Sequence, residues 1–206
     1  MVHNTPLLST AYLPSVQYMA CLAKYTTVYI EQHETFPKQT FRNRTLIATG
    51  NGPLMLNVPV SRPQGNHTQT GNITVSYHEP WNIRHWRAIV SAYNAAPYFL
   101  YYRDGFEEIL SQHFSLLSEL NDALLRYILC KLKIKCKVIY TTDYQSPDNI
   151  QLDYRNSMTS KKKPFDFKMP PYSQVFDTRH GFIPNLSVID LLFNLGPESK
   201  NYLQAL

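Results

Sequence analysis

Residues 33–44 bring five ionisable side chains together on one short connection of the chain. They are an imidazole, a carboxylate, an ammonium and two guanidinium groups, supplied by His33, Glu34, Lys38, Arg42 and Arg44. Arginine makes bidentate contacts with phosphate or carboxylate and lysine adds a point charge, so Lys38, Arg42 and Arg44 are predicted to hold an anion. The same spacing also fits a solvated basic loop, and the sequence leaves both interpretations open.

Two histidines are candidate general bases. Because imidazole changes charge near neutral pH, His33 or His85 can take a proton from a hydroxyl or an amine of a substrate. His85 follows Trp81 by four residues, and this spacing puts both side chains on one face of a predicted helix. Trp81 is therefore a candidate ligand contact, although His85 also fits a histidine of the core.

The elements that must position these residues begin with a predicted strand–helix–strand unit. An apolar run at 7–13 ends before a proline, and apolar residues then recur at helical spacing over 16–23. A β-branched and aromatic run at 26–30 predicts the second strand.

If these two strands are parallel, the segments that follow them leave the same edge of the sheet. Open α/β sheets bind ligands at that carboxyl edge. The loop 12–18 and the segment 33–44 both follow such strands. Tyr12 and Tyr18 are therefore predicted to contact the ligand beside the charged segment.

The remaining pattern predicts one α/β domain over residues 1–206, with a mostly parallel sheet, flanking helices and a β-hairpin insertion. We expect the hairpin at 45–60, further strands at 72–77, 137–140 and 172–176, helices at 80–97, 106–133 and 186–195, and an exposed loop at 146–170.

The composition favours a cytoplasmic protein that binds a small molecule. The net charge of +5 is spread without a long basic stripe, which argues against nucleic acid as the partner. The three cysteines form no Cys-x-x-Cys pair and are predicted to be buried free thiols in a reducing compartment.

We see no signal peptide, and no apolar run approaches the roughly 20 residues of a membrane span. No phosphate-binding glycine motif or metal-ligand spacing occurs, so no cofactor and no metal are predicted.

Several stretches, in order, resemble one bacterial family. They are residues 12–18, residues 31–44 with Lys38 and Asn43, the stretch from Trp81 to Pro97-Tyr98-Phe99, residues 172–174, and residues 184–196. Together they are similar to the WbqC-like family, and the resemblance covers most of the chain.

The resemblance implies a role in the biosynthesis of surface polysaccharide, such as O-antigen. It implies a transferase that adds glycine or another small acyl or aminoacyl group to an activated sugar. The ligand is then an anionic small molecule, either a sugar nucleotide or an activated acyl donor. Asn43 and Gln174, which lie in the matching stretches, join the predicted substrate contacts. The sequence leaves open a non-catalytic protein that binds sugar nucleotides or glycans, and it does not indicate the oligomeric state.

Overall fold

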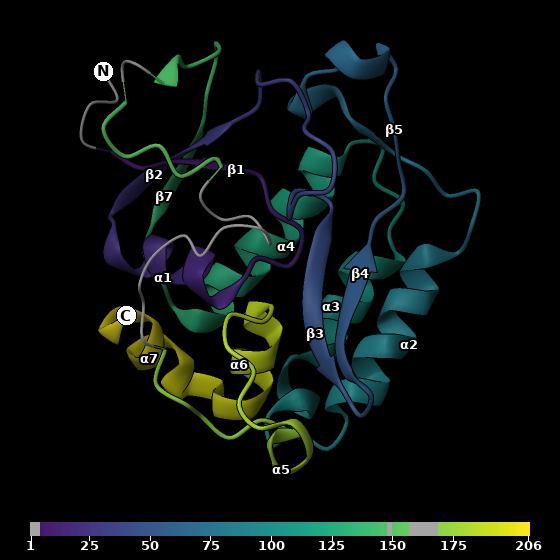
Figure 1. Cartoon of the computed structure of the whole chain (residues 1–206), viewed down its shortest axis with the longest axis vertical. Helices are drawn as coiled ribbons and strands as arrows, with labels where there is room; N and C mark the ends of the chain where they lie inside the picture. Colours follow the sequence, from purple (N-terminus) through teal and green to yellow (C-terminus); the bar gives the residue numbers. More distant parts are fainter. Residues whose placement is uncertain (1–4, 148–149, 157–168) are drawn as a thin grey trace.

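The computed structural model describes residues 5–147, 150–156 and 169–206 of the chain (Figure 1). Its strands are β1 (Leu7–Ser9), β2 (Thr27–Glu31), β3 (Arg44–Thr49), β4 (Gly52–Asn57), β5 (Val60–Ser61), β6 (Thr74–Val75) and β7 (Lys137–Tyr140). Its helices are α1 (Val16–Lys24), α2 (Trp81–Tyr93), α3 (Phe99–Ser111), α4 (Leu117–Leu132), α5 (Asp177–His180), α6 (Val188–Leu195) and α7 (Ser199–Ala205), with 3-10 turns η1 (Gly65–His67), η2 (Thr70–Asn72) and η4 (Gly196–Glu198).

A parallel sheet in the order β1–β2–β7 positions the candidate site. Leu7 of β1 pairs with Tyr29 of β2, and strands β2 and β7 are parallel as well. Helix α1 connects β1 to β2, which confirms the predicted strand–helix–strand unit, and Figure 1 shows the three strands above α1. Ser15 caps α1, because its hydroxyl accepts a hydrogen bond from the Tyr18 amide at 3.4 Å.

The predicted β-hairpin is confirmed as the antiparallel pair β3–β4, in which Thr49 lies opposite Gly52. Gly52 closes the turn with a φ of +103°, a backbone conformation that side-chain-bearing residues resist. The hairpin lies beside α2 in Figure 1, and the Ala48 amide of β3 donates a hydrogen bond to the Tyr93 hydroxyl of α2 at 3.2 Å.

The single long helix expected at 106–133 is wrong, because the chain there forms two helices, α3 and α4, separated by a short loop. The apolar periodicity gave no sign of the break, since Phe114 of the loop also contacts the core. Helix α4 begins with its own cap: the Glu119 carboxylate accepts a hydrogen bond from the Leu116 amide at 3.0 Å.

Helix α6 is a central element of the hydrophobic core, and its residues 188–193 are all buried. Phe193 of α6 meets three other rings, with centroid distances of 5.4 Å to Tyr93, 5.1 Å to Phe99 and 5.6 Å to Phe106. These contacts join α6 to α2 and α3, while α7 contacts α1. The core thus holds both halves of the chain around the parallel sheet and the hairpin.

Other local expectations need correction. No strand forms over 172–176, because side-chain hydrogen bonds hold this stretch to α5 and α6. The strand expected at 72–77 is limited to the two residues of β6. The expected exposed loop at 146–170 lies partly outside the described residues, and within the described part Ile150 and Arg155 are buried. The cysteines are free thiols as expected, but the prediction that they are buried is wrong: Cys130 is exposed on α4, and Cys21 and Cys136 are half-buried.

Candidate functional site

The last residue of β2, Glu31, is a fully buried carboxylate at the carboxyl edge of the sheet. Its Oε1 accepts hydrogen bonds from the His33 amide at 2.8 Å and from the Thr141 hydroxyl at 2.9 Å. Its Oε2 accepts one from the Gln145 amide at 2.9 Å and lies 3.5 Å from Nη1 of Arg155, which also donates to the Gln145 carbonyl at 2.8 Å. Glu31 therefore ties together the segments that follow β2 and β7. A buried charge requires partners of this kind.

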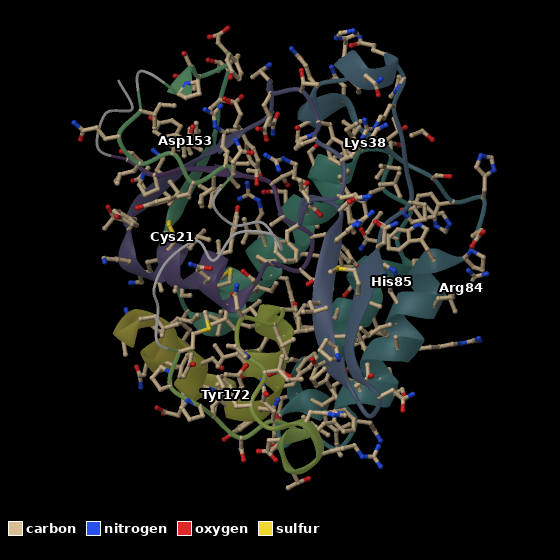
Figure 2. The ribbon with its side chains drawn as sticks, in the orientation of Figure 1. Cys21, Lys38, Arg84, His85, Asp153 and Tyr172 are labelled. Atoms are coloured by element: carbon tan, nitrogen blue, oxygen red, sulfur yellow. The ribbon has the colours of Figure 1, made fainter. Side chains whose placement is uncertain are left out.

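Arg155 supplies the second part of this network from a segment that runs beside β1. The backbone of residues 152–154 hydrogen-bonds with Leu7 of β1 at 3.0 and 2.8 Å. The Arg155 guanidinium binds both carboxylate oxygens of Asp153, with Nε at 2.9 Å from Oδ1 and Nη2 at 2.5 Å from Oδ2. Its Cζ lies 5.5 Å from the centroid of the Tyr144 ring, so Arg155 also supports that ring from one side. Figure 2 labels Asp153 at the sheet end of the molecule, away from Tyr172.

A second buried ion pair joins Arg42 to Glu34. The Arg42 side chain is 1% exposed, and its Nε and Nη2 both donate to Oε1 of Glu34, at 2.8 and 2.6 Å. Nη2 also donates to the Arg155 carbonyl at 3.3 Å, so the two ion pairs are neighbours. Burial raises the pKa of Glu34, the Arg42 guanidinium opposes that rise, and the nearby Glu31 carboxylate adds to it.

A pocket of about 470 Å³ opens over this network. It is lined by His33, Glu34, Thr35, Pro37, Tyr144 and Asn156. The residues around this space thus carry an imidazole, a carboxylate, a hydroxyl and an amide, together with an aromatic ring and a proline. This mixture of polar groups with an apolar wall is typical of small-molecule sites.

His33, which lines this pocket, has a defined ring orientation. Its Nε2 lies 3.0 Å from the Thr141 carbonyl oxygen. Because a carbonyl only accepts hydrogen bonds, Nε2 must carry the proton. In the neutral ring Nδ1 then keeps its lone pair, and Nδ1 makes no hydrogen bond within the part of the chain that the structure describes. His33 therefore has the geometry of a general base.

His85 lies in a different environment, in the aromatic cluster between the hairpin and α2. Its side chain is buried, its Nδ1 is 2.9 Å from the Tyr12 hydroxyl, and its ring centroid is 5.1 Å from that of Trp81. Burial lowers the pKa of His85 to about 4, although a hydrogen bond with the Asn57 backbone opposes the change. Tyr12 and Trp81 are buried in the same cluster. The three predicted site residues Tyr12, Trp81 and His85 are therefore together, but as part of the core and away from the pocket.

The predicted cations do not converge on one cleft. Arg42 precedes β3 and points into the buried ion pair, whereas Arg44 of β3 donates from its Nε to Oδ1 of Asn57 at 3.0 Å on the surface. The two arginines were expected on one side of an extended strand, but residue 42 belongs to a turn. Lys38 is exposed and follows the pocket residue Pro37. Of the three cations, only Lys38 is both exposed and close in sequence to the pocket.

The remaining predicted contacts serve local structure. Asn43 donates to the Val58 carbonyl at 2.9 Å, which fixes the end of the hairpin. The Tyr18 hydroxyl donates to the Ser9 carbonyl at 2.9 Å, and Tyr18 is buried. Neither side chain lines the pocket.

Gln174 lies in a separate polar cluster beside α6. Its Nε2 donates to Oδ2 of Asp190 at 2.9 Å, and the Tyr172 hydroxyl donates to the same oxygen at 2.7 Å. Asp190 is fully buried, and burial raises the pKa of its carboxyl group while these donors oppose the rise. Figure 2 shows Tyr172 at the opposite end of the molecule from Lys38 and Asp153, so Gln174 is not brought to the pocket.

Reasoning from the sequence gave no role to Glu31 at the end of β2, and it missed members of the site that follow β7, among them Tyr144, Asp153, Arg155 and Asn156. Tyr144 carried a usable signal, because it closely follows β7 and thus lies at the predicted ligand edge. Asp153, Arg155 and Asn156 fall in a stretch poor in apolar residues, and nothing in their spacing indicates that this stretch pairs with β1.

Within residues 5–147, 150–156 and 169–206, no group of three or more His, Cys, Asp or Glu side chains is arranged to hold a metal ion. None of the helices in this described part is long and apolar enough to cross a membrane.

The fold and the pocket define a single-domain α/β protein with a polar pocket at the carboxyl edge of a small parallel sheet. The chain belongs to the WbqC-like protein family, whose sequence profile matches residues 10–162 and 163–202. A relative from Mycobacterium tuberculosis (strain ATCC 25618 / H37Rv), named Uncharacterized protein Rv1507c, is 27% identical over 223 residues, and the match covers 96% of each chain. No solved structure matches the chain.

Proposed function

We propose that the protein is a cytoplasmic transferase of surface-polysaccharide biosynthesis that adds glycine or another small acyl or aminoacyl group to an activated sugar. The pocket over Glu31 would be its reaction site. The resemblance to the WbqC-like family supports the biosynthetic role, and the geometry of His33 supports the chemistry.

The observation that carries this proposal is Nδ1 of His33, which accepts no hydrogen bond from any described residue while the bond from Nε2 to the Thr141 carbonyl orients the ring. In the proposed step Nδ1 accepts the proton of a sugar hydroxyl or amine, and the sugar heteroatom forms a bond to the carbonyl carbon of an activated acyl donor. The bond from that carbon to the leaving group breaks with its electron pair. The proton then passes from His33 to the leaving group, which restores the neutral base.

The test is to incubate the protein with a panel of sugar nucleotides and activated acyl or aminoacyl donors and to search the mixtures for new products by mass spectrometry. For a productive pair, His33→Gln should lower the rate about 100-fold or more, because a positioned base contributes rate enhancements of that order. His180→Gln is the matched control, since His180 also bonds a backbone carbonyl through Nε2, at 3.1 Å from the Gly50 oxygen, but lies exposed in another part of the molecule. Equal rates for the two variants would contradict the role of His33.

A non-catalytic protein that binds a sugar nucleotide or a glycan is the second candidate. One observation favours it: Arg42 and Arg155 are both bound by carboxylates, so these buried cations are not free to stabilise charge that develops during transfer. Tight binding without product, across every donor in the panel, would select this function over the transferase.

A further inference from the structure

Among the residues that the structure describes, the charged side chains next to the pocket do not balance. Three carboxylates, those of Glu31, Glu34 and Asp153, face the two guanidiniums of Arg42 and Arg155. Each guanidinium is at most 3% exposed and is bound by a carboxylate. When all five groups are ionised, one negative charge is left over, so this network favours a cation rather than the anion that the sequence led us to expect.

Of the three carboxylates, Glu34 is the one that lines the pocket. Both Arg42 nitrogens bind its Oε1, and its Oε2 accepts no hydrogen bond from any residue that the structure describes. Glu34 lines the pocket although its side chain is only 11% exposed. A carboxylate oxygen in so sheltered a position gains more from a charged donor than from a neutral one, because water screens the interaction less there.

We infer that the pocket holds its ligand through a primary ammonium group, which donates hydrogen bonds to Oε2 of Glu34 beside the Tyr144 ring. This inference deepens the proposed function and rests on it for the pocket being the reaction site. The ammonium would belong either to an amino-sugar acceptor or to an aminoacyl donor. In the first case the nitrogen lies in the pocket that His33 also lines, so Nδ1 of His33 can take the proton that this nitrogen must lose before it forms a bond.

An activated sugar also carries phosphate, and the structure offers a separate place for it. Lys38 is exposed, follows Pro37 of the pocket wall, and makes no ion pair within the described part of the chain. The ligand that fits both features is zwitterionic, with its amine inside the pocket and its anion at the rim next to Lys38.

Two pairs of probes test the inference and separate the two sources of the amine. N-acetylglucosamine differs from glucosamine by an acetyl group that removes the charge of one nitrogen, and glycinamide differs from acetamide by one ammonium group on the same amide. Binding is measured by calorimetry or by amide chemical shifts at neutral pH. We expect the cationic member of at least one pair to bind about tenfold or more tightly, the scale of one charge-assisted hydrogen bond. Equal affinity within both pairs would overturn the inference.

The variant Glu34→Gln should reduce that preference to about threefold or less, because it replaces the carboxylate with a neutral amide of the same shape. Glu79→Gln is the matched control: Glu79 also pairs with an arginine, Arg84, at 2.6 Å, but on the exposed surface. If Glu34→Gln does not fold, the double variant Glu34→Leu/Arg42→Met removes both buried charges together, an exchange that proteins often tolerate. A folded variant of either kind that keeps the tenfold preference would overturn the inference.

The two proposals fail differently. A preference for the amine that depends on Glu34, without product from any donor, would contradict the transferase and leave the ammonium site standing. Product formation that depends on His33, with amine selectivity unchanged in Glu34→Gln, would support the transferase and overturn the ammonium site.

Discussion

His33 and His85 are the same kind of residue in two opposite environments, and the contrast separates a candidate reaction site from a structural core. His33 lies at the carboxyl edge of the sheet, where one ring nitrogen is held by a carbonyl and the ring lines a pocket. His85 lies among Tyr12 and Trp81, where the Tyr12 hydroxyl and the Asn57 backbone bond the ring and burial keeps it neutral. A histidine is available for chemistry when one nitrogen is oriented and the other is left open.

The two regions also differ in what stabilises them. The pocket rests on buried ion pairs that link three chain segments, whereas the aromatic cluster rests on the burial of large rings. A buried ion pair loses most of its stability when one partner is removed, whereas the burial of ring surface does not depend on one specific partner. Substitutions of Arg155, His85 and Arg44 test this difference between the two regions, and their expected effects decrease in that order.

Arg155→Met should give the largest loss, about 3–5 kcal/mol in the free energy of unfolding, because it leaves the fully buried Glu31 and the half-buried Asp153 without their cation. Urea unfolding at neutral pH measures this change. Arg84→Met is the control, since the exposed pair of Arg84 with Glu79 should contribute less than about 1 kcal/mol. A loss for Arg155→Met as small as that of the control would mean that the network does not hold the pocket together.

His85 should make stability depend on pH. Its pKa is about 4 in the folded protein and near 6.5 when unfolded, so below pH 6.5 the unfolded chain binds the proton that the folded protein excludes. The stability that neutral His85 provides is therefore complete above pH 6.5 and falls by up to about 3 kcal/mol as the pH drops towards 4. Denaturant unfolding measures the free energy of unfolding at several pH values between 4 and 6.5. This free energy should depend less on pH for His85→Gln than for the unchanged protein. If the free energy of unfolding changes with pH equally in both proteins, His85 is not held neutral by burial.

Arg44→Ala should give the smallest effect, within about 0.5 kcal/mol of the unchanged protein, because its hydrogen bond to Asn57 is exposed. Ligand affinity should also stay the same, since Arg44 belongs to the hairpin and not to the pocket. A tenfold loss of affinity in this variant would restore the view that residues 33–44 act together as one cationic site.

The sequence was sufficient to predict most of the local helices and strands. It was not sufficient to predict which residues the charged side chains pair with. Alternating and helical patterns predicted β2, the hairpin and α6, and parallel strands placed residues after β2 at the ligand edge, where His33 does line a pocket. The same reasoning gave Arg42 a free guanidinium, because nothing in the spacing shows that Glu34 folds back onto it. Arg155 comes from a stretch with few apolar residues, and its place beside β1 depends on backbone pairing with Leu7 that no local pattern records.

The most direct test of the account is to follow the two histidine rings by NMR while glucosamine or a panel of sugar nucleotides is added. The ring signals are assigned by their loss in His33→Gln and His85→Gln. We predict that the His33 signals shift with the added ligand and saturate, while the His85 signals stay where they are, because only His33 lines the pocket. Shifts of the His85 signals with His33 unmoved, or no response of His33 to any of these ligands, would contradict the placement of the site at the carboxyl edge of the sheet.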